Sequence, residues 1–113
     1  MSVIVDLAKR QLDAYNAASL EAFVACYHDD VRVFHGEELS IEGKALFRER
    51  YRTLFTEWRF GAEVPQRLNL GSHCIDYERW WRIDPESGQR SEGELLVRYH
   101  ERDGVIAVVQ FLS

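Results

Sequence analysis

Residues 73–83 concentrate side chains that can exchange protons. If this segment is a strand, its residues alternate between two faces, and Asp76 and Glu78 fall on the same face, two positions apart. Two carboxyl groups that share a pocket raise one pKa, so that group can act as an acid near neutral pH. The other interpretation is a structural network at the rim, in which both acids pair with nearby arginines. Those arginines are Arg79, Arg82 and Arg98.

Two later segments carry further polar candidates for a ligand site. In residues 92–101, Arg98 shares one strand face with His100, a pair suited to binding an anion. An outer surface or a dimer interface fits that pair equally well. Gln110 interrupts an otherwise apolar final strand, and buried amides are kept where they have partners, so it is a candidate to line a pocket.

Helical spacing dominates the first half of the chain. Apolar residues recur every three to four positions and predict helices at about 3–17, 20–27 and 42–58. A β-branched and aromatic run predicts a short strand at 31–35, and residues 36–40 are predicted to be a polar break. On the helices, Tyr15 and Trp58 fall on faces that should point at the sheet. Both are candidates for ligand contact, with core packing as the competing interpretation.

After Gly61 the spacing changes to period two, which is typical of strands. Four strands are expected, at about 64–70, 73–83, 92–101 and 105–112. Because short turns join them, these strands must be antiparallel. One sheet face needs a cover, which the amphipathic helices supply. The expected fold class is therefore α+β, with three helices packed on one side of a curved antiparallel sheet.

The composition excludes several classes of protein. A length of 113 residues corresponds to a single domain, residues 1–113. The net charge of −5 and the absence of a basic run argue against a nucleic-acid partner, because phosphate binding requires clustered Lys and Arg. Arginine outnumbers lysine by 12 to 2, which reflects either genome composition or planar recognition of carboxylates.

The expected location is the cytoplasm, with no membrane partner. The N-terminus lacks the basic start and apolar run of a signal peptide. The longest stretch without Asp, Glu, Lys or Arg is ten residues, 104–113, well short of the ~20 that span a bilayer. Cys26 and Cys74 lie far apart in apolar stretches, so we expect both to be buried and reduced.

Several catalytic chemistries lack their motifs in this chain. There is no Gly-rich phosphate loop and no Gly-x-Ser-x-Gly elbow. The four histidines never occur at metal-ligand spacing, and the two lysines occupy polar helix positions. We therefore expect neither a bound metal nor an organic cofactor.

Four segments carry a family resemblance. They are residues 15–31, with a small-residue turn between helices and Asp29-Asp30 before a strand; residues 42–48; residues 74–78; and residues 103–111. On these segments nearly the whole chain resembles the nuclear transport factor 2-like superfamily, which includes ketosteroid isomerases, scytalone dehydratase and polyketide cyclases of the SnoaL type. The resemblance implies a cone with a pocket for a small apolar molecule between the helices and the concave sheet face. It also implies a homodimer through the outer sheet face.

The resemblance also implies which positions would carry steroid isomerase chemistry. Alignment of the opening segments puts His35 at the position of the family's carboxylate base and Gln11 at that of its oxyanion-binding tyrosine. The late aspartate falls near Leu96 or Val97, so the oxyanion pair is missing and that specific mechanism is disfavoured. An imidazole at His35 can still move a proton near neutral pH. The alternative is a solvated or hydrogen-bonded histidine at a strand end.

Two functions fit these observations. The first is a cofactor-free acid–base enzyme acting on a small, mostly apolar carbonyl or hydroxyl compound. In it His35 is the base and Asp76 or Glu78 the partner acid. Arg98 or Gln110 polarises an oxygen. The second is a non-catalytic ligand-binding or dimerisation module, suggested by the missing oxyanion pair and the aromatic-rich sheet.

Overall fold

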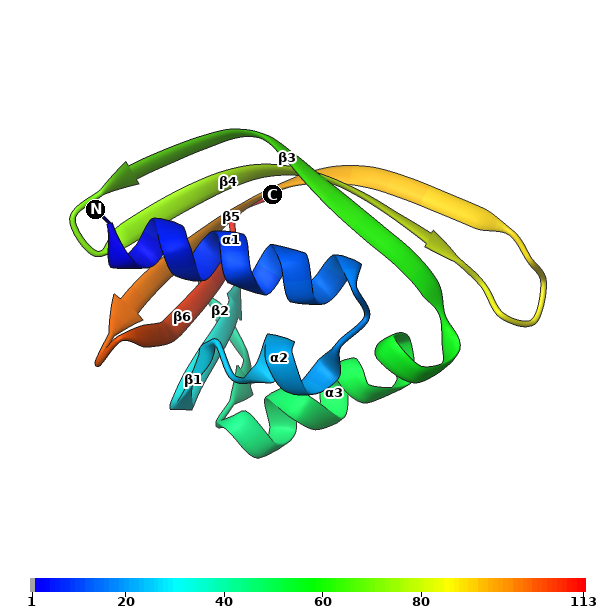
Figure 1. Cartoon of the computed structure of the whole chain (residues 1–113), viewed down its shortest axis with the longest axis horizontal. Coiled ribbons are helices and arrows are strands. Elements are labelled where there is room, and N and C mark those ends of the chain that lie inside the picture. The colour runs from blue at the N-terminus through cyan, green and yellow to red at the C-terminus, as the bar shows by residue number, and fades with distance from the viewer. Residues whose placement is uncertain (1) are drawn as a thin grey trace.

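A computed structural model describes residues 2–113 as three helices and one six-stranded sheet (Figure 1). The helices are α1 (Val3–Asn16), α2 (Leu20–Val24) and α3 (Lys44–Glu57). The strands are β1 (Tyr27–His35), β2 (Glu38–Glu42), β3 (Arg59–Leu70), β4 (His73–Ile83), β5 (Arg90–Arg102) and β6 (Val105–Phe111). Within this part of the chain, no helix combines the length and the apolar character needed to cross a membrane.

The sheet has the strand order β2-β1-β6-β5-β4-β3. Strands β3 to β6 form the predicted antiparallel meander, and β1 joins it by pairing parallel to β6. The sheet curves strongly, and all three helices lie on its concave side (Figure 1). The predicted α+β class, with a curved sheet covered by three helices, is confirmed.

One strand was not predicted. Residues 36–40 were expected to form a polar break, whereas residues 38–42 form β2 at the sheet edge. Of its five residues only Ile41 is buried, because an edge strand facing solvent needs little apolar surface. The alternation that identifies a half-buried strand is therefore absent there. Strand β1 also begins earlier than expected, at Tyr27. Its pairing with β6 shifts in register between Tyr27 and Arg32, in the segment that contains the exposed residues Asp29 and Asp30.

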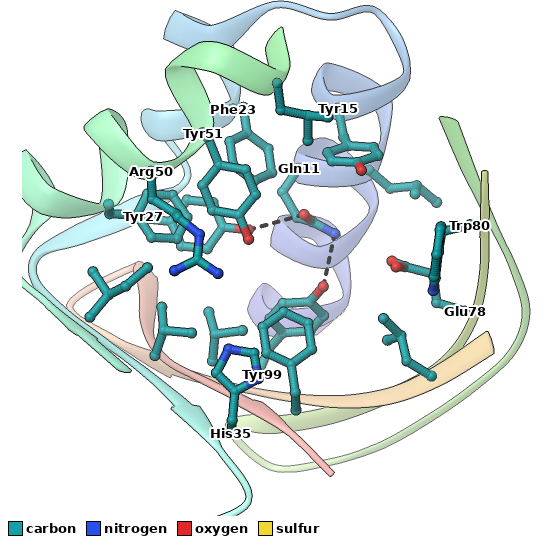
Figure 2. Close-up of a pocket in the computed structure, with 18 of the residues that line it drawn as sticks. Gln11, Tyr15, Phe23, Tyr27, His35, Arg50, Tyr51, Glu78, Trp80 and Tyr99 are labelled. Carbon is teal, nitrogen blue, oxygen red and sulfur yellow. Dashed lines mark hydrogen bonds between the residues drawn. The ribbon is translucent and has the colours of Figure 1, made fainter. Parts of the chain in front are cut away.

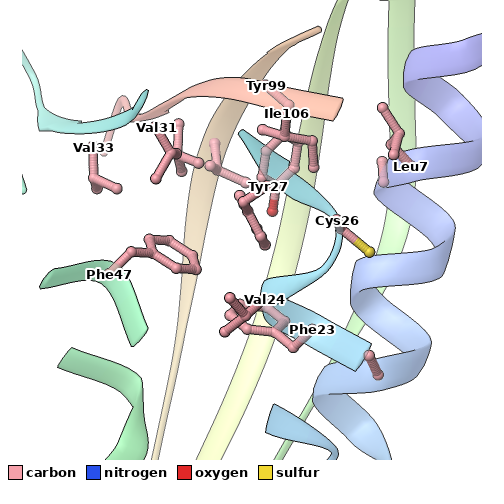
Figure 3. Packing of buried hydrophobic residues seen from close by; sticks show 14 of the residues in the cluster. Leu7, Phe23, Val24, Cys26, Tyr27, Val31, Val33, Phe47, Tyr99 and Ile106 are labelled. Atoms are coloured by element: carbon pink, nitrogen blue, oxygen red, sulfur yellow. The ribbon is translucent and has the colours of Figure 1, made fainter. Parts of the chain in front are cut away.

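The core lies between α1, α2 and the concave sheet face (Figure 3). Helix α1 is capped by the Ser2 hydroxyl, which accepts a hydrogen bond from the amide of Val5 at 3.4 Å. The rings of Phe23 and Phe47 stack with their centroids 5.7 Å apart, which joins α2 to α3. Cys26 and Cys74 are both buried and unpaired, as expected.

Two glycines, one in each strand that flanks β4, seat the two tryptophans of β4 on opposite faces of the sheet. Trp80 lies over Gly93 on the concave side, and Trp81 lies over Gly61 on the convex side. A Cβ at Gly93 would lie 2.6 Å from the Trp80 ring, and one at Gly61 would lie 2.7 Å from the Trp81 ring. Such distances exclude any larger residue unless the ring moves, so these glycines fix where the indoles rest.

Candidate functional site

A cavity of about 530 Å³ lies between the helices and the concave face of the sheet (Figure 2). This volume falls within the ~300–1,000 Å³ of small-molecule sites. Aromatic and aliphatic side chains form most of its wall, among them Phe23, Phe47 and Leu95. A smaller set of polar side chains from α1, α3, β1, β4 and β5 interrupts that wall. These polar side chains decide what the cavity can do.

Strand β4 turns its even-numbered residues toward the cavity. The alternation of residues 73–83 in the sequence did not show which of their two faces would do so. Of the two predicted acids, only Glu78 lines the cavity. Asp76 is completely buried below it and is held by Arg67 of β3: Nε donates to Oδ1 at 2.7 Å and Nη2 to Oδ2 at 2.9 Å. The thiol of Cys74 also lies within 3.3 Å of Oδ1. Asp76 therefore forms an ion pair, as the structural interpretation of the two acids predicted. Its partner, Arg67, was not among the arginines named for that role.

Glu78 is the one carboxyl side chain among residues 2–113 that lines the cavity. Its pKa is raised to about 7: burial contributes most, the charge of Asp76 adds to the increase, and the charge of Arg82 opposes both. The expected elevation of one carboxyl pKa is thus present, although desolvation contributes more than repulsion. At neutral pH both forms of Glu78 are populated, so this group can accept or give up a proton.

A chain of hydrogen bonds crosses the cavity floor through Gln11 (Figure 2). The hydroxyl of Tyr27 donates to Gln11 Oε1 at 3.0 Å. Gln11 Nε2 donates to the carbonyl of Ala8 at 3.1 Å and to the hydroxyl of Tyr99 at 3.3 Å. Burial raises the pKa of both tyrosines well above 10, so both stay protonated. Because the Tyr99 oxygen accepts from Gln11, its proton can be donated to an oxygen in the cavity.

Tyr27 and Tyr99 were missed by sequence reasoning. Tyr27 ends the helix predicted at 20–27, and Tyr99 lies in the strand predicted at 92–101, on the face opposite Arg98. Gln11 and Tyr99 are 88 positions apart in the chain, so no local pattern joins them. The available signal was the alternation of β5, which puts Tyr99 on the same face as the buried Val97.

His35 lies at the end of β1 and lines the cavity, as its candidate role requires. Its ring stacks on Phe111 of β6 with a centroid separation of 5.0 Å and an interplanar angle of 21°, which fixes the plane of the imidazole. Arg50 of α3, which was not predicted, also lines the cavity, and its guanidinium points into the same space (Figure 2).

Arg82 extends the polar side of the cavity beyond Glu78. Its guanidinium carbon lies 5.5 Å from the centre of the Trp80 ring, a cation–π contact. Its Nε is buried and has no hydrogen-bond partner within residues 2–113. Tyr15, a predicted ligand contact, also lines the cavity, and burial raises its pKa against the opposing charge of Arg82. Arg82 was considered only as a possible ion-pair partner.

Three predicted ligand contacts lie away from the cavity. Trp58 packs partly buried against the core at the end of α3. Strand alternation turns Arg98 and Gln110 to the convex face, where Arg98 Nε donates to Gln110 Oε1 at 2.9 Å. Gln110 also donates to the carbonyl of Gly36 at 2.8 Å. The predicted role of these two residues in polarising a ligand oxygen does not fit this placement.

No group of three or more His, Cys, Asp or Glu side chains in residues 2–113 is arranged to hold a metal ion. The polar side chains that line the cavity are suited to proton transfer, hydrogen bonding and anion binding. The residues for these are Glu78, His35, Tyr99, Arg50 and Arg82.

Solved structures with the same fold include proteins of different activity. An uncharacterized cystatin fold protein from Novosphingobium aromaticivorans matches with a TM-score of 0.87 and 22% identity, covering 100% of this chain and 99% of that one. A Δ5-3-ketosteroid isomerase from Mycobacterium sp. matches with a TM-score of 0.87 and 17% identity, covering 98% of this chain and 92% of its own. A computationally designed 17-OHP binder matches with a TM-score of 0.88 and 16% identity, over 98% and 92%.

Identities this low show a shared fold and nothing about activity. A comparison with curated proteins finds no significant match to this sequence. The model of the SnoaL-like domain matches residues 8–109, which is most of the chain. The resemblance to the nuclear transport factor 2-like superfamily is thus confirmed, and the chain belongs to the SnoaL-like domain family.

Proposed function

We propose that this protein is a cofactor-free acid–base enzyme that acts on a small, mostly apolar carbonyl or hydroxyl compound held in the cavity. Isomerisation of an unsaturated ketone, dehydration of a β-hydroxycarbonyl compound and aldol cyclisation each begin with loss of a proton from the carbon beside a carbonyl group. The observation that carries the proposal is Glu78, a carboxyl group with a pKa of about 7 in a cavity lined mostly by aromatic and aliphatic side chains. A general base is most effective when its pKa lies near the working pH.

Tyr99 supplies the second requirement, which is stabilisation of the oxygen that gains charge. When Glu78 removes a proton from the carbon beside a carbonyl group, the electrons of the C–H bond form a C=C bond and the carbonyl oxygen becomes an enolate. The Tyr99 hydroxyl is held by Gln11 and lies close enough to Glu78 for that charge to raise its pKa. A donor fixed in advance at such a position stabilises the transition state.

His35 is the proposed second proton carrier. Its ring lines the cavity and is fixed against Phe111. It returns a proton to another carbon of the enolate, giving an isomer, or protonates a departing hydroxyl group, giving an alkene and water. Asp76 has no part in this proposal, because Arg67 occupies both of its carboxylate oxygens.

Exchange of α-protons tests the proposal without knowledge of the natural substrate. 2-Tetralone and cyclohexanone are dissolved in D2O with the protein, and loss of the α-proton signals is followed by NMR. We expect faster exchange than in buffer, and a fall of ~100-fold in Glu78→Gln, because a general base typically contributes 10²–10⁴. Glu57→Gln, an exposed carboxyl on α3, is the matched control. Exchange no faster than buffer, or unchanged by Glu78→Gln, contradicts the proposal.

A non-catalytic ligand-binding module is the second candidate. It is supported by the similarity to a designed 17-OHP binder, which uses this fold to bind a ligand. It also agrees with the absence of the steroid isomerase oxyanion pair, since Gln11 replaces the tyrosine. Binding of both ketones, seen by calorimetry, without accelerated exchange would favour this module over the enzyme.

We also propose that the protein is a cytoplasmic homodimer that pairs through its convex sheet face. One row of side chains crosses all six strands on that face. In register, the row is Leu39, Phe34, Gln110, Arg98, Ile75 and Leu68. Leu39 and Leu68 are 49% and 73% exposed, and Leu96 nearby is 40% exposed. Apolar side chains gathered on one face are typical of an interaction surface.

A further inference from the structure

The net charge of the side chains that line the cavity is opposite in sign to the net charge of the whole chain. The chain carries a net charge of −5. The cavity is lined by two arginines, Arg50 and Arg82, against one carboxyl side chain, Glu78. Glu78 is only partly ionised at neutral pH, because its pKa is about 7. An anion therefore meets a net positive set of side chains once it enters the cavity.

The two cavity arginines form no ion pair with a carboxylate among residues 2–113, and Arg10, Arg32, Arg59 and Arg98, which lie outside the cavity, form none either. Six arginines form ion pairs with carboxylates: Arg48, Arg52, Arg67, Arg79, Arg90 and Arg102. Neither Arg50 nor Arg82 is among the ion-paired arginines of residues 2–113. An arginine is always charged, so one that lines a partly apolar cavity without a carboxylate is suited to an anion from outside.

Arg82 also lacks a hydrogen-bond partner for one of its donors. Its Nε is the single buried side-chain nitrogen or oxygen in residues 2–113 that lacks a hydrogen-bond partner. Buried donors are nearly always satisfied, so an unsatisfied one requires an explanation, and a ligand that accepts from the Arg82 guanidinium supplies one. Arg50 has no such deficit, because its side chain is largely exposed to solvent at the cavity.

The orientation of the Arg82 guanidinium is fixed by its neighbours. The group lies over the Trp80 ring at 5.5 Å, and Trp80 is itself seated on Gly93. A planar guanidinium held in one plane can donate two parallel hydrogen bonds to the two oxygens of a carboxylate. Holding it in place before the ligand arrives lowers the cost of ordering on binding.

We infer that Arg82 anchors a carboxylate, and that the ligands of this cavity are apolar monocarboxylic acids. The carboxylate lies against Arg82, and the apolar body of the ligand lies against the aromatic wall. A ligand with one negative charge fits this site better than a phosphate dianion. Arg82 supplies a single positive charge, and the neighbouring Glu78 becomes anionic as pH rises and repels further negative charge. The inference shares its cavity with the proposed function but does not require catalysis.

Glu78 connects the binding of an acid to the uptake of a proton. A carboxylate at Arg82 adds a negative charge near Glu78 and offsets the arginine, so Glu78 binds a proton more tightly. The charged and titratable groups near Glu78 come from five elements, and His35 of β1 and Arg50 of α3 line the same cavity. The groups near Glu78 are Asp76 and Arg82 of β4, Tyr15 of α1, Tyr27 of β1, Tyr51 of α3 and Tyr99 of β5. Burial keeps the pKa of the tyrosines high, so Glu78 and His35 are the cavity groups that can take up the proton, and we assign the uptake to Glu78 because it neighbours Arg82.

A matched pair of probes tests the inference by calorimetry at pH 7.5. The probes are 2-naphthoate and 2-naphthamide, which differ in the charge of one planar group. We expect the wild-type protein to bind the acid at least tenfold more tightly than the amide. Arg82→Gln should bring the two affinities within about twofold, and Arg82→Lys should retain part of the preference. Arg59→Gln, an exposed arginine on β3, is the control and should keep the full preference.

Proton uptake provides an independent readout. Binding of 2-naphthoate, measured in buffers of different ionisation enthalpy, should take up a fraction of a proton in the wild type and none in Glu78→Gln. Equal affinity for acid and amide, failure of both probes to bind, or a preference that survives Arg82→Gln would overturn the inference. A preserved acid preference without ketone exchange would refute catalysis and leave the carboxylate site intact. If Arg82→Gln does not fold, the Arg82→Lys series and the proton uptake still decide.

Discussion

Asp76 and Glu78 show how neighbouring residues of one type acquire different properties. Both lie on the concave face of β4, two positions apart. Arg67 reaches Asp76 with two hydrogen bonds, and Asp76 is completely buried. Glu78 lines the cavity, where burial raises its pKa to about 7. The presence of two acids on one strand face was predictable, but their roles depend on an arginine from β3 that the sequence does not place.

Glu78 should make the stability of the protein fall as pH rises. Its pKa is about 7 in the folded protein and about 4.5 when unfolded, so the folded state binds the proton more tightly. Below about pH 4.5, Glu78 is protonated in both states and does not lower the free energy of unfolding. Above about pH 7, its ionisation lowers that free energy by the full amount, up to about 3 kcal/mol. Denaturant unfolding of Glu78→Gln should therefore show a gain over wild type that grows between pH 5 and 8.

The matched control for this effect is Glu57→Gln, which removes an exposed carboxyl group from α3. Its difference in unfolding free energy from wild type should stay nearly constant over the same pH range. If Glu78→Gln behaves in the same way, the Glu78 carboxyl is not buried as described.

At the scale of elements, the chain's periodicity predicted most of the fold. The bounds of β4 agree with the prediction, because its turns are marked by Gly71 and by residues 84–88. Strand β2 was missed, because its pairing with β1 stabilises it rather than any apolar pattern of its own. The Gln11–Tyr99 contact was missed for a similar reason: it depends on how α1 lies across β5.

The seating of Trp80 on Gly93 yields a prediction about how β5 positions the site. Gly93→Ala places a Cβ within 2.6 Å of the Trp80 ring and so must displace the ring and the guanidinium of Arg82 above it. We expect a loss of about 1–3 kcal/mol in unfolding free energy. We also expect the preference for 2-naphthoate over 2-naphthamide to fall at least threefold.

Gly61→Ala is the matched control, because it displaces Trp81 on the opposite face by a similar clash. It should lower stability by a comparable amount and leave the preference for the acid unchanged. Equal loss of preference in both variants would show a general effect of destabilisation rather than positioning of Arg82.

At the scale of the whole molecule, the two faces of the sheet have different proposed tasks. The concave face and the helices enclose the cavity, and the convex face carries the row from Leu39 to Leu68. The fold alone does not choose a function, since its relatives include an isomerase and a designed binder. The choice comes from particular cavity side chains, which the sequence identified only in part.

The proposed dimer predicts that a charge on the convex face will separate the subunits. Leu96→Glu places a carboxylate among the exposed apolar side chains of that face, where its burial against a second copy is costly. Light scattering coupled to size-exclusion chromatography should report a dimer for wild type and a monomer for Leu96→Glu. Leu46→Glu, on an exposed position of α3, should remain a dimer. A monomeric wild type would refute this assembly.

The most direct test of the central claim is the pH dependence of proton transfer. The rate at which α-deuterated 2-tetralone loses its deuterium in H2O is measured between pH 4 and 9. We predict a rise to a plateau with a midpoint of about 7, the pKa of Glu78, because its carboxylate takes the proton. Glu78→Gln should be ~100-fold slower with that midpoint lost, which separates Glu78 from His35. A rate in Glu78→Gln equal to that of wild type would contradict the account.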